Sequence, residues 1–399
     1  MKILVLILRG FHLGYLGCYG NSWIDTPHLD SLSSEGVVFD HHYVDCPSLA
    51  GARRAWRTGR YHFPSLEPKP ALALSDAQDL LSVLRGSNIP AILISDSEIL
   101  SGNDDEKWHE RIPYRLNETK NDFSTTIGKT VLQAIRKLKS QDHGLVCVET
   151  NFLNPPWFQD ESAADYFSEP ADEDSSEGPI EPLNNPTIGW VDRSDDLAFA
   201  RLQRTYATMV SQLDGRMGEL MEELRGRERD NPMMLVVTTD RGFPLGEHGL
   251  TGDYRPWLHE ELVHIPLIIH MPKGTSAGTR IRALTQPVDL MPTLLDAFGC
   301  NVLQVDGSSL LPLIRGDQER IREFACSGLR IGNALEWSLR THDWAFLTPI
   351  FPEENDPPRD RQLYVKPDDR RESNNVLQHH PDLAENLEKT LNAFIQSHP

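Results

Sequence analysis

Short apolar runs alternate along the chain with segments whose apolar positions recur every three or four residues. Residues 2–8 (KILVLIL) form a continuous apolar run, as expected for a strand buried on both faces of a parallel sheet. Further strands are predicted at residues 37–39, 91–94, 145–149, 235–239 and 265–270. Strands that alternate with helices predict an α/β fold with a mostly parallel central sheet.

Helical periodicity is clearest in residues 198–225, where apolar side chains at three- and four-residue spacing predict a long amphipathic helix. Thr26 and Pro27 are typical of an N-cap and a first helical position, so a helix is expected to begin there. Further helices are predicted at residues 49–58, 288–298 and about 381–396.

The domain organisation follows from these elements. The α/β domain is expected to occupy residues 1–300, and a smaller α+β part, residues 301–399, is expected to add a short antiparallel sheet and the terminal helix. Residues 160–182 contain nine acidic side chains, three prolines and no basic side chain. Such a composition predicts a solvated surface loop or insertion.

Charge and cysteine content narrow the class of protein. The 399 residues carry a net charge of −20, and an acidic surface repels phosphate backbones and anionic lipids, so neither nucleic acid nor membrane is an expected partner. The five cysteines form no CxxC pair and no disulfide framework is expected. The apolar start lacks the features of a signal peptide, which predicts a cytoplasmic protein.

An ordered set of short motifs resembles the sulfatase family of the alkaline phosphatase superfamily. The motifs keep the family's order over nearly the whole length of the chain, and the ordered set carries the resemblance. The matching segments are residues 16–20 (LGCYG), 26–30 (TPHLD), 35–39 (EGVVF), 58–61 (TGRY), 239–242 (TDRG), 245–250 (LGEHGL), 288–295 (VDLMPTLL) and 306–313 (DGSSLLPL). The resemblance implies a sulfatase-like, alkaline-phosphatase-like α/β sandwich.

The resemblance also implies a defined chemistry. Sulfatases use a formylglycine made from Cys or Ser in a C/S-x-P-x-R motif, beside a divalent cation held mainly by carboxylates. The nucleophile attacks sulfur, the cation gathers the oxygens, and an acid protonates the leaving group. Calcium or magnesium would be expected as cofactor only in a member that keeps this machinery, since hard cations require several oxygen ligands.

The nucleophile position of this chain is Leu49, reached both by counting back from residues 58–60 and by counting forward from Tyr43. Leucine cannot be converted to formylglycine, so no catalytic residue is assigned. Arg53 retains the arginine of the motif. Cys46 stands three residues too early, and a catalytic thiol there is the less favoured interpretation. Ser48 is adjacent, but no base is identifiable beside it.

The metal-ligand positions have changed as well. The paired aspartates that end the family's first strand are replaced here by Arg9 and Gly10. Asp240 is retained, Arg241 replaces a ligand, and Asp253 replaces a lysine. Asp240 alone cannot hold a hard divalent ion well, so no cofactor is expected and Asp240 is the only candidate ligand.

Other family positions are also lost. Asn154 and the residues up to Trp157 stand where many members carry a histidine, and residues 95–98 (SDSE) replace a Gly-Lys-Trp-His segment. Residues 107–109 (KWH) repeat those letters about eleven positions late, and their match is interpreted as coincidence.

Two interpretations of the remaining charged residues stay open. Arg9, Arg53 and Arg241 form a structural ion-pair cluster with Asp240 and Asp253, or they bind an anion such as sulfate or a sulfated sugar. His248 is assigned to the same ligand-binding set, with support of its loop favoured over a role as base.

The leading functional prediction is therefore a catalytically inactive sulfatase relative, a pseudo-sulfatase that binds an anionic small molecule, sugar or partner through the remnant pocket. The alternative is an arylsulfatase-like hydrolase of sulfate or phosphate esters with an altered active site. The sequence predicts no oligomeric state.

Overall fold

The computed structural model describes residues 1–64, 79–96, 107–113, 129–137, 143–157, 181–192, 194–228, 232–301, 304–351 and 360–398. The acidic segment 160–182 lies outside this part of the chain except for its last two residues. Among the described residues, no helix combines the length and apolar character needed to cross a bilayer.

A central sheet of eight strands, in the order β10-β2-β9-β7-β1-β5-β3-β4, organises the molecule. All pairings are parallel except those of β9, which runs antiparallel to both β2 and β7. The α/β fold with a mostly parallel sheet is thus confirmed. The strands are β1 (Lys2–Leu8), β2 (Val37–His42), β3 (Ala91–Ser95), β4 (Glu110–Pro113), β5 (Gly144–Thr150), β7 (Met233–Thr238), β9 (Leu267–His270) and β10 (Thr279–Thr285).

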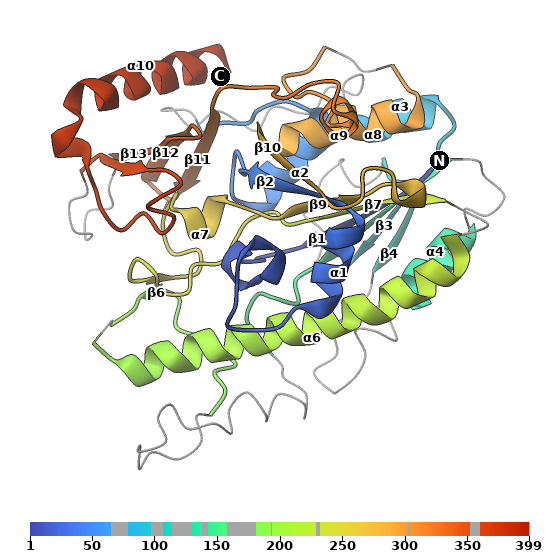
Figure 1. Ribbon diagram of the computed structural model, residues 1–399, viewed down its shortest axis with the longest axis horizontal. Helices are drawn as coiled ribbons and strands as arrows, with labels where there is room; N and C mark the ends of the chain where they lie inside the picture. Colours follow the sequence, from blue (N-terminus) through green and yellow to red (C-terminus); the bar gives the residue numbers. More distant parts are fainter. Residues whose placement is uncertain are drawn as a thin grey trace.

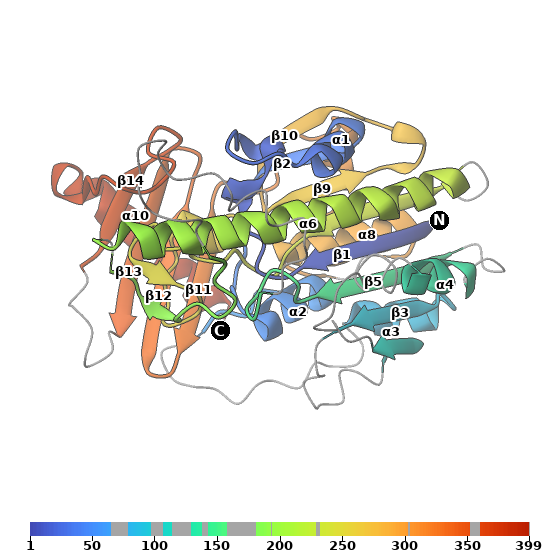
Figure 2. The same ribbon diagram turned by 90° about the horizontal axis from the view of Figure 1, so that it is seen from below.

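Helices cover both faces of this sheet (Figures 1 and 2). Alternate residues of β1 point to opposite sides, so Leu4 and Leu6 join the core under one helical layer and Ile3 and Val5 the core under the other. The first layer contains α1 (Pro27–Glu35), α4 (Lys129–Lys137) and α6 (Asp196–Glu228), and the second contains α2 (Leu49–Thr58), α3 (Leu80–Gly86), α8 (Leu290–Phe298) and α9 (Leu311–Arg315).

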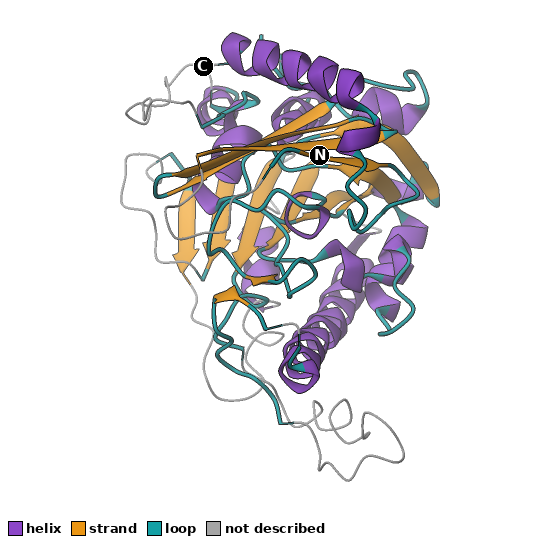
Figure 3. Cartoon of the chain, turned by 90° about the vertical axis from the view of Figure 1, so that its left-hand side faces the viewer, coloured by secondary structure: helices purple, strands orange, loops and turns teal. Residues whose placement is uncertain are grey.

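A second, four-stranded antiparallel sheet follows in the C-terminal part, as predicted. Its strands are β11 (Ala325–Ile331), β12 (Ala334–Arg340), β13 (Trp344–Phe351) and β14 (Gln362–Val365). Helix α10 (Pro381–Ser397) lies across this sheet (Figure 3) and buries Leu387 and Leu391 against it.

The two sheets are joined through a shared apolar cluster and a buried ionic one. Leu329 of β11 packs with Tyr43 and with α7 (Glu260–Val263). Arg340 of β12, itself bound to the buried Glu372, donates to the carbonyl of Leu258 over 2.7 Å, and Nζ of Lys366 lies 3.0 Å from Oε2 of Glu260 in α7. The C-terminal sheet is therefore attached to the segment that contains α7 and leads into β9 of the central sheet.

Local details differ from the sequence prediction at two points. The strand predicted from residue 265 begins at Leu267, because Ile265 instead pairs its N–H with the carbonyl of His42. Thr26 occupies the N-cap of α1, but its hydroxyl accepts from the N–H of Gly17 and not from the helix.

Candidate functional site

The carboxyl ends of β1 and β7 place Arg9 and Asp240 side by side, because these strands are paired neighbours in the sheet. Nε of Arg9 lies 3.5 Å from Oδ2 of Asp240, and the N–H of Gly10 donates to Oδ1 over 3.2 Å. Asp240 is buried, with 2% of its side chain exposed. A carboxylate so deeply buried requires cationic and hydrogen-bonding partners to stay ionised.

Arg241 supplies the second guanidinium and links two carboxylates. Its Nη1 donates to Oδ2 of Asp240 over 2.7 Å, and its Nε donates to Oδ1 of Asp253 over 3.0 Å, with Nη2 on the other oxygen. Burial alone would lower the pKa of Arg241, but Asp240 and Asp253 outweigh it and raise the pKa above its ordinary value. We call Arg9, Asp240, Arg241 and Asp253 the charged network.

Position 10, where the family has its second aspartate, is closed to a carboxylate side chain. Gly10 has φ +76°, and a Cβ atom there would lie 2.7 Å from Oδ1 of Asn154. The Asn154 amide is held in place because it donates to the carbonyl of Arg9 over 2.9 Å, and Tyr206 donates to the carbonyl of Gly10 over 2.7 Å. Both the backbone conformation and the packing thus favour glycine.

Arg53 has a different partner from the one predicted. Its Nε donates to Oε1 of Glu149 over 2.9 Å and its Nη2 reaches the other oxygen, a bidentate pair that ties α2 to the end of β5. Glu149 is 1% exposed. Sequence reasoning missed Glu149; its one signal was a charged residue at the end of an otherwise apolar strand.

The residues around Leu49 form the beginning of α2. Leu49 is the first helical residue, and the hydroxyl of Ser48 caps the helix by accepting from the N–H of Gly51 over 3.1 Å. Cys46 fills the space above the first turn, because a Cβ at Gly51 would lie 2.4 Å from its Sγ. Burial raises the pKa of the Cys46 thiol to about 12.

His248 belongs to another cluster. Its Nδ1 lies 2.8 Å from Oε1 of Glu261, its Nε2 lies 3.1 Å from the carbonyl of Glu372, and its ring stacks on His259 at 3.8 Å between centroids. Burial lowers the pKa of His248, but the bond to Glu261 and the nearby carboxylates outweigh it and raise the pKa to about 9. His248 is therefore protonated at neutral pH and supports the contact with the C-terminal part.

Residues 107–109, which repeat the letters of a family motif, have structural contacts. Nζ of Lys107 lies 3.6 Å from Oδ2 of Asp79, a buried carboxylate that also binds Arg57. Trp108 is buried in the core beside Trp56. At the position that corresponds to the motif, the described residue Asp96 accepts from the N–H of Asn151; Ser97 and Glu98 lie outside the described residues.

The side chains do not fit a divalent cation at Asp240. Both carboxylate oxygens of Asp240 are already engaged by Arg9, Arg241 and the Gly10 N–H. Within the part of the chain that the structure describes, no group of three or more His, Cys, Asp or Glu side chains is placed to hold a metal ion. A hard cation prefers six or more oxygen ligands, and guanidinium groups repel it.

An aromatic platform lies next to Asp253. It is built from Trp190 of β6 (Gly189–Trp190), which pairs with β8 (Leu250–Thr251), and from Tyr254, Arg255 and Trp257, which follow β8. The rings of Trp190 and Trp257 meet edge to face at 5.6 Å, and the guanidinium of Arg255 lies over both. Trp190 and Tyr254 are 44% and 41% exposed.

The sheet order, the helices on both faces and the site at the carboxyl ends of β1 and β7 define a sandwich of the alkaline-phosphatase type. A family model described as Sulfatase matches residues 2–300. The chain therefore belongs to the sulfatase family.

Similarity to individual proteins is consistent with this membership. Arylsulfatase K of Danio rerio is 27% identical over 94% of this chain and 80% of its own length. N-acetylglucosamine-6-O-sulfatase of Bacteroides thetaiotaomicron is 33% identical, but the match covers 30% of this chain and only 21% of that protein.

Solved structures agree in fold. A protein in complex with its substrate D-glucosamine-2-N,6-O-disulfate superposes with a TM-score of 0.76 at 16% identity, covering 99% of this chain and 97% of the other. A phosphonate monoester hydrolase of Agrobacterium radiobacter superposes with a TM-score of 0.74 at 18% identity, covering 100% and 96%.

Proposed function

We propose that this protein is a non-hydrolytic member of the sulfatase family that binds a sulfated or otherwise anionic sugar at the remnant of the active site. The observation that carries the proposal is the position of Arg9 and Arg241 on Asp240. Two permanent cations take the place where a divalent ion would bind this carboxylate, so the site keeps its charge balance without metal.

The lack of a nucleophile supports the same proposal. The alkyl side chain of Leu49 cannot attack sulfur, and Ser48 uses its hydroxyl to cap α2. Cys46, whose raised pKa keeps the thiol protonated at neutral pH, is a weak nucleophile. Three candidate positions at the start of α2 thus offer no activated oxygen or sulfur.

The ligand class is supported by the surroundings of the charged network. Exposed aromatic faces beside polar groups are typical of sites that bind a ring with an apolar face. Trp190 and Tyr254, the exposed rings of the platform, adjoin Asp253, and the buried Trp257 packs against Trp190. Among proteins similar in fold, one was solved with a disulfated glucosamine. We assign the platform to the sugar ring and the arginines to its anionic group.

Hydrolysis is tested first. The purified protein is offered aryl sulfates and aryl phosphates with calcium, magnesium, manganese or zinc, and no turnover is expected under any condition. Turnover that disappears in Asp240→Ala would contradict the proposal and favour a hydrolase with rebuilt chemistry.

Binding is tested by thermal shift and calorimetry with D-glucosamine-2-N,6-O-disulfate. Trp190→Ala and Arg9→Gln are expected to weaken binding, by about fivefold or more each, because each removes one proposed contact. Arg225→Gln is the matched control, since Arg225 of α6 forms a solvent-exposed ion pair with Glu35 of α1, outside the charged network. Equal binding by all variants would assign a structural role to the charged network.

A further inference from the structure

A cavity of about 200 Å³ lies where the central sheet meets the C-terminal sheet. Asp40 and His41 come from β2, Tyr43 directly follows that strand, and Arg280 belongs to β10. The C-terminal part contributes residues 341–342 of the β12–β13 turn and residues 366–370 after β14. We call this the interface cavity. It shares no lining residue with the charged network, and β2 is separated from β1 by β9 and β7.

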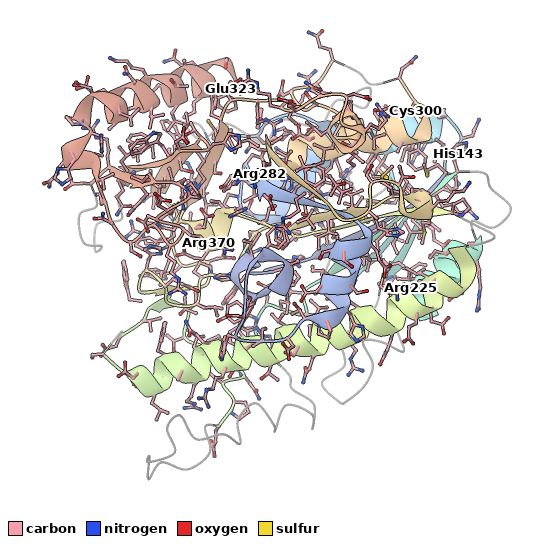
Figure 4. The ribbon with its side chains drawn as sticks, viewed as in Figure 1. His143, Arg225, Arg282, Cys300, Glu323 and Arg370 are labelled. Carbon is pink, nitrogen blue, oxygen red and sulfur yellow. The ribbon has the colours of Figure 1, made fainter. Side chains whose placement is uncertain are left out.

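The charged groups around the interface cavity are occupied by one another. Arg280 pairs with Asp40, and Nζ of Lys366 lies 3.0 Å from Oε2 of Glu260. Arg370, which lies between the C-terminal sheet and the N-terminal segment (Figure 4), donates to the carbonyl of Tyr19 over 2.7 Å. Each of these three cationic side chains therefore already has a partner within the protein.

Three polar groups, in contrast, make no hydrogen bond to any other described residue. They are the hydroxyl of Tyr43, the ring nitrogens of His41 and those of His342, for which only ring contacts and backbone bonds are found. Tyr43 as a whole is 4% exposed, and it lines the cavity, where its hydroxyl is left to bond water or a ligand. A ligand that displaces water from these groups keeps affinity only if it reproduces the hydrogen bonds that the water makes.

The rings around these groups are held in fixed positions. His264 is fastened at both nitrogens, to Glu260 and to the carbonyl of Asp40, and its ring lies 4.6 Å from that of Tyr43. His41 lies nearly parallel to Tyr43, with an interplanar angle of 13°. Burial, followed by the nearby His264 and His342, lowers the pKa of His41 to about 4, so at neutral pH its ring offers one donor and one acceptor.

We propose that the interface cavity binds one uncharged sugar ring, through the hydroxyl of Tyr43 and the imidazoles of His41 and His342. Hydroxyl groups of a sugar both donate and accept, so they match the phenol of Tyr43 and the neutral imidazole of His41 better than a carboxylate or phosphate does. The volume is below the range of about 300–1,000 Å³ for drug-sized ligands and suits a single ring. This site does not depend on the function proposed for the charged network.

Calorimetry with N-acetylglucosamine, galactose and glucose tests the proposal on the full chain. At least one of them is expected to bind, and Tyr43→Phe is expected to weaken that binding about five- to tenfold, because it removes one hydroxyl and keeps the ring. His342→Ala, at an exposed position, is expected to weaken it as well. An unchanged melting temperature of both variants shows that they fold.

Two controls separate this site from the other one. Tyr254→Phe is the matched tyrosine control on the aromatic platform and is expected to leave neutral-sugar binding unchanged, as is Arg9→Gln. The affinity for a short oligosaccharide is compared with the affinity for its single sugar units. Binding of the oligosaccharide that is tenfold tighter would show that the natural ligand is a residue of a glycan, and equal affinity would show that it is a free monosaccharide.

Three results would overturn the proposal. The first is that no neutral sugar binds at concentrations up to about 50 mM, which is about 50 times a Kd of 1 mM. The second is that Tyr43→Phe and Tyr254→Phe lose affinity for the sugar to the same extent. The third is that inorganic sulfate competes with the sugar and that this competition disappears in Arg370→Ala. The last would show that the cavity is an anion site.

Discussion

Replacing Arg241 by glutamine should reveal how strongly the charged network depends on its central guanidinium. The substitution leaves the carboxylate of Asp240, 2% exposed, with Arg9 at 3.5 Å and the Gly10 N–H at 3.2 Å. Removing one partner of a buried ion pair typically costs about 3–5 kcal/mol, and the remaining partners offset part of this. We expect the free energy of unfolding to fall by about 3 kcal/mol. The bond to the half-exposed Asp253 adds at most about 1 kcal/mol.

The double variant Asp240→Asn/Arg241→Gln tests whether the loss arises from the lone carboxylate. Removing both charges leaves no buried unpaired anion, so the double variant is expected to lose about 2 kcal/mol less than the sum of the two single variants. Urea unfolding at pH 7, followed by tryptophan fluorescence, measures these differences.

The reasoning would be refuted by a loss below about 1 kcal/mol for Arg241→Gln, or by single effects that add within about 0.5 kcal/mol in the double variant. Arg225→Gln provides the matched control, because its ion pair with Glu35 is exposed on both sides and should contribute less than about 1 kcal/mol.

Three further substitutions have definite expected outcomes. The pKa of His248 is raised from 6.5 to about 9, so the protonated ring stabilises the folded protein fully below pH 6.5, and this stabilisation is lost as the pH rises through 9. In urea unfolding, His248→Asn should therefore lower the free energy of unfolding by about 2–3 kcal/mol at pH 6 and by little at pH 10. Burial raises the pKa of Asp45 from 3.8 to about 7, so Asp45→Asn should stabilise the protein by about 2–4 kcal/mol above pH 7 and leave it unchanged below pH 4; equal effects at both pH values would contradict this. Gly51→Ala should destabilise α2 by about 1–3 kcal/mol in the same melts although alanine favours helices, since its Cβ would meet Cys46; a more stable variant would contradict the packing.

The hydrophobic pattern predicted most of the fold, because the faces of a helix or strand that are buried determine the spacing of its apolar residues along the sequence. The run at residues 2–8 and the spacing over residues 198–225 correspond to β1 and α6, since each element is buried along one face or on both. The contact of Arg9 with Asp240 also follows from sequence, because each residue follows a buried strand that ends at the same edge.

Side-chain partners were predictable only where backbone topology determined them. Arg53 was expected beside Asp240 but binds Glu149, because the direction of a long side chain depends on the packing of α2 against β5. His248 meets the carbonyl of Glu372, 124 residues away, and such a contact depends on how the C-terminal sheet docks. The assignment of Arg9, Arg53, Asp240, Arg241, His248 and Asp253 to ligand binding stays a prediction.

The closed geometry around Gly10 has a consequence for redesign. An aspartate at residue 10 would collide with Asn154, and an aspartate at residue 9 would place a second carboxylate beside Asp240 with one cation fewer. Each single substitution toward a carboxylate metal site would therefore give a less stable protein, as would loss of Arg241. Carboxylate ligands could be introduced here only by changing several of these positions together.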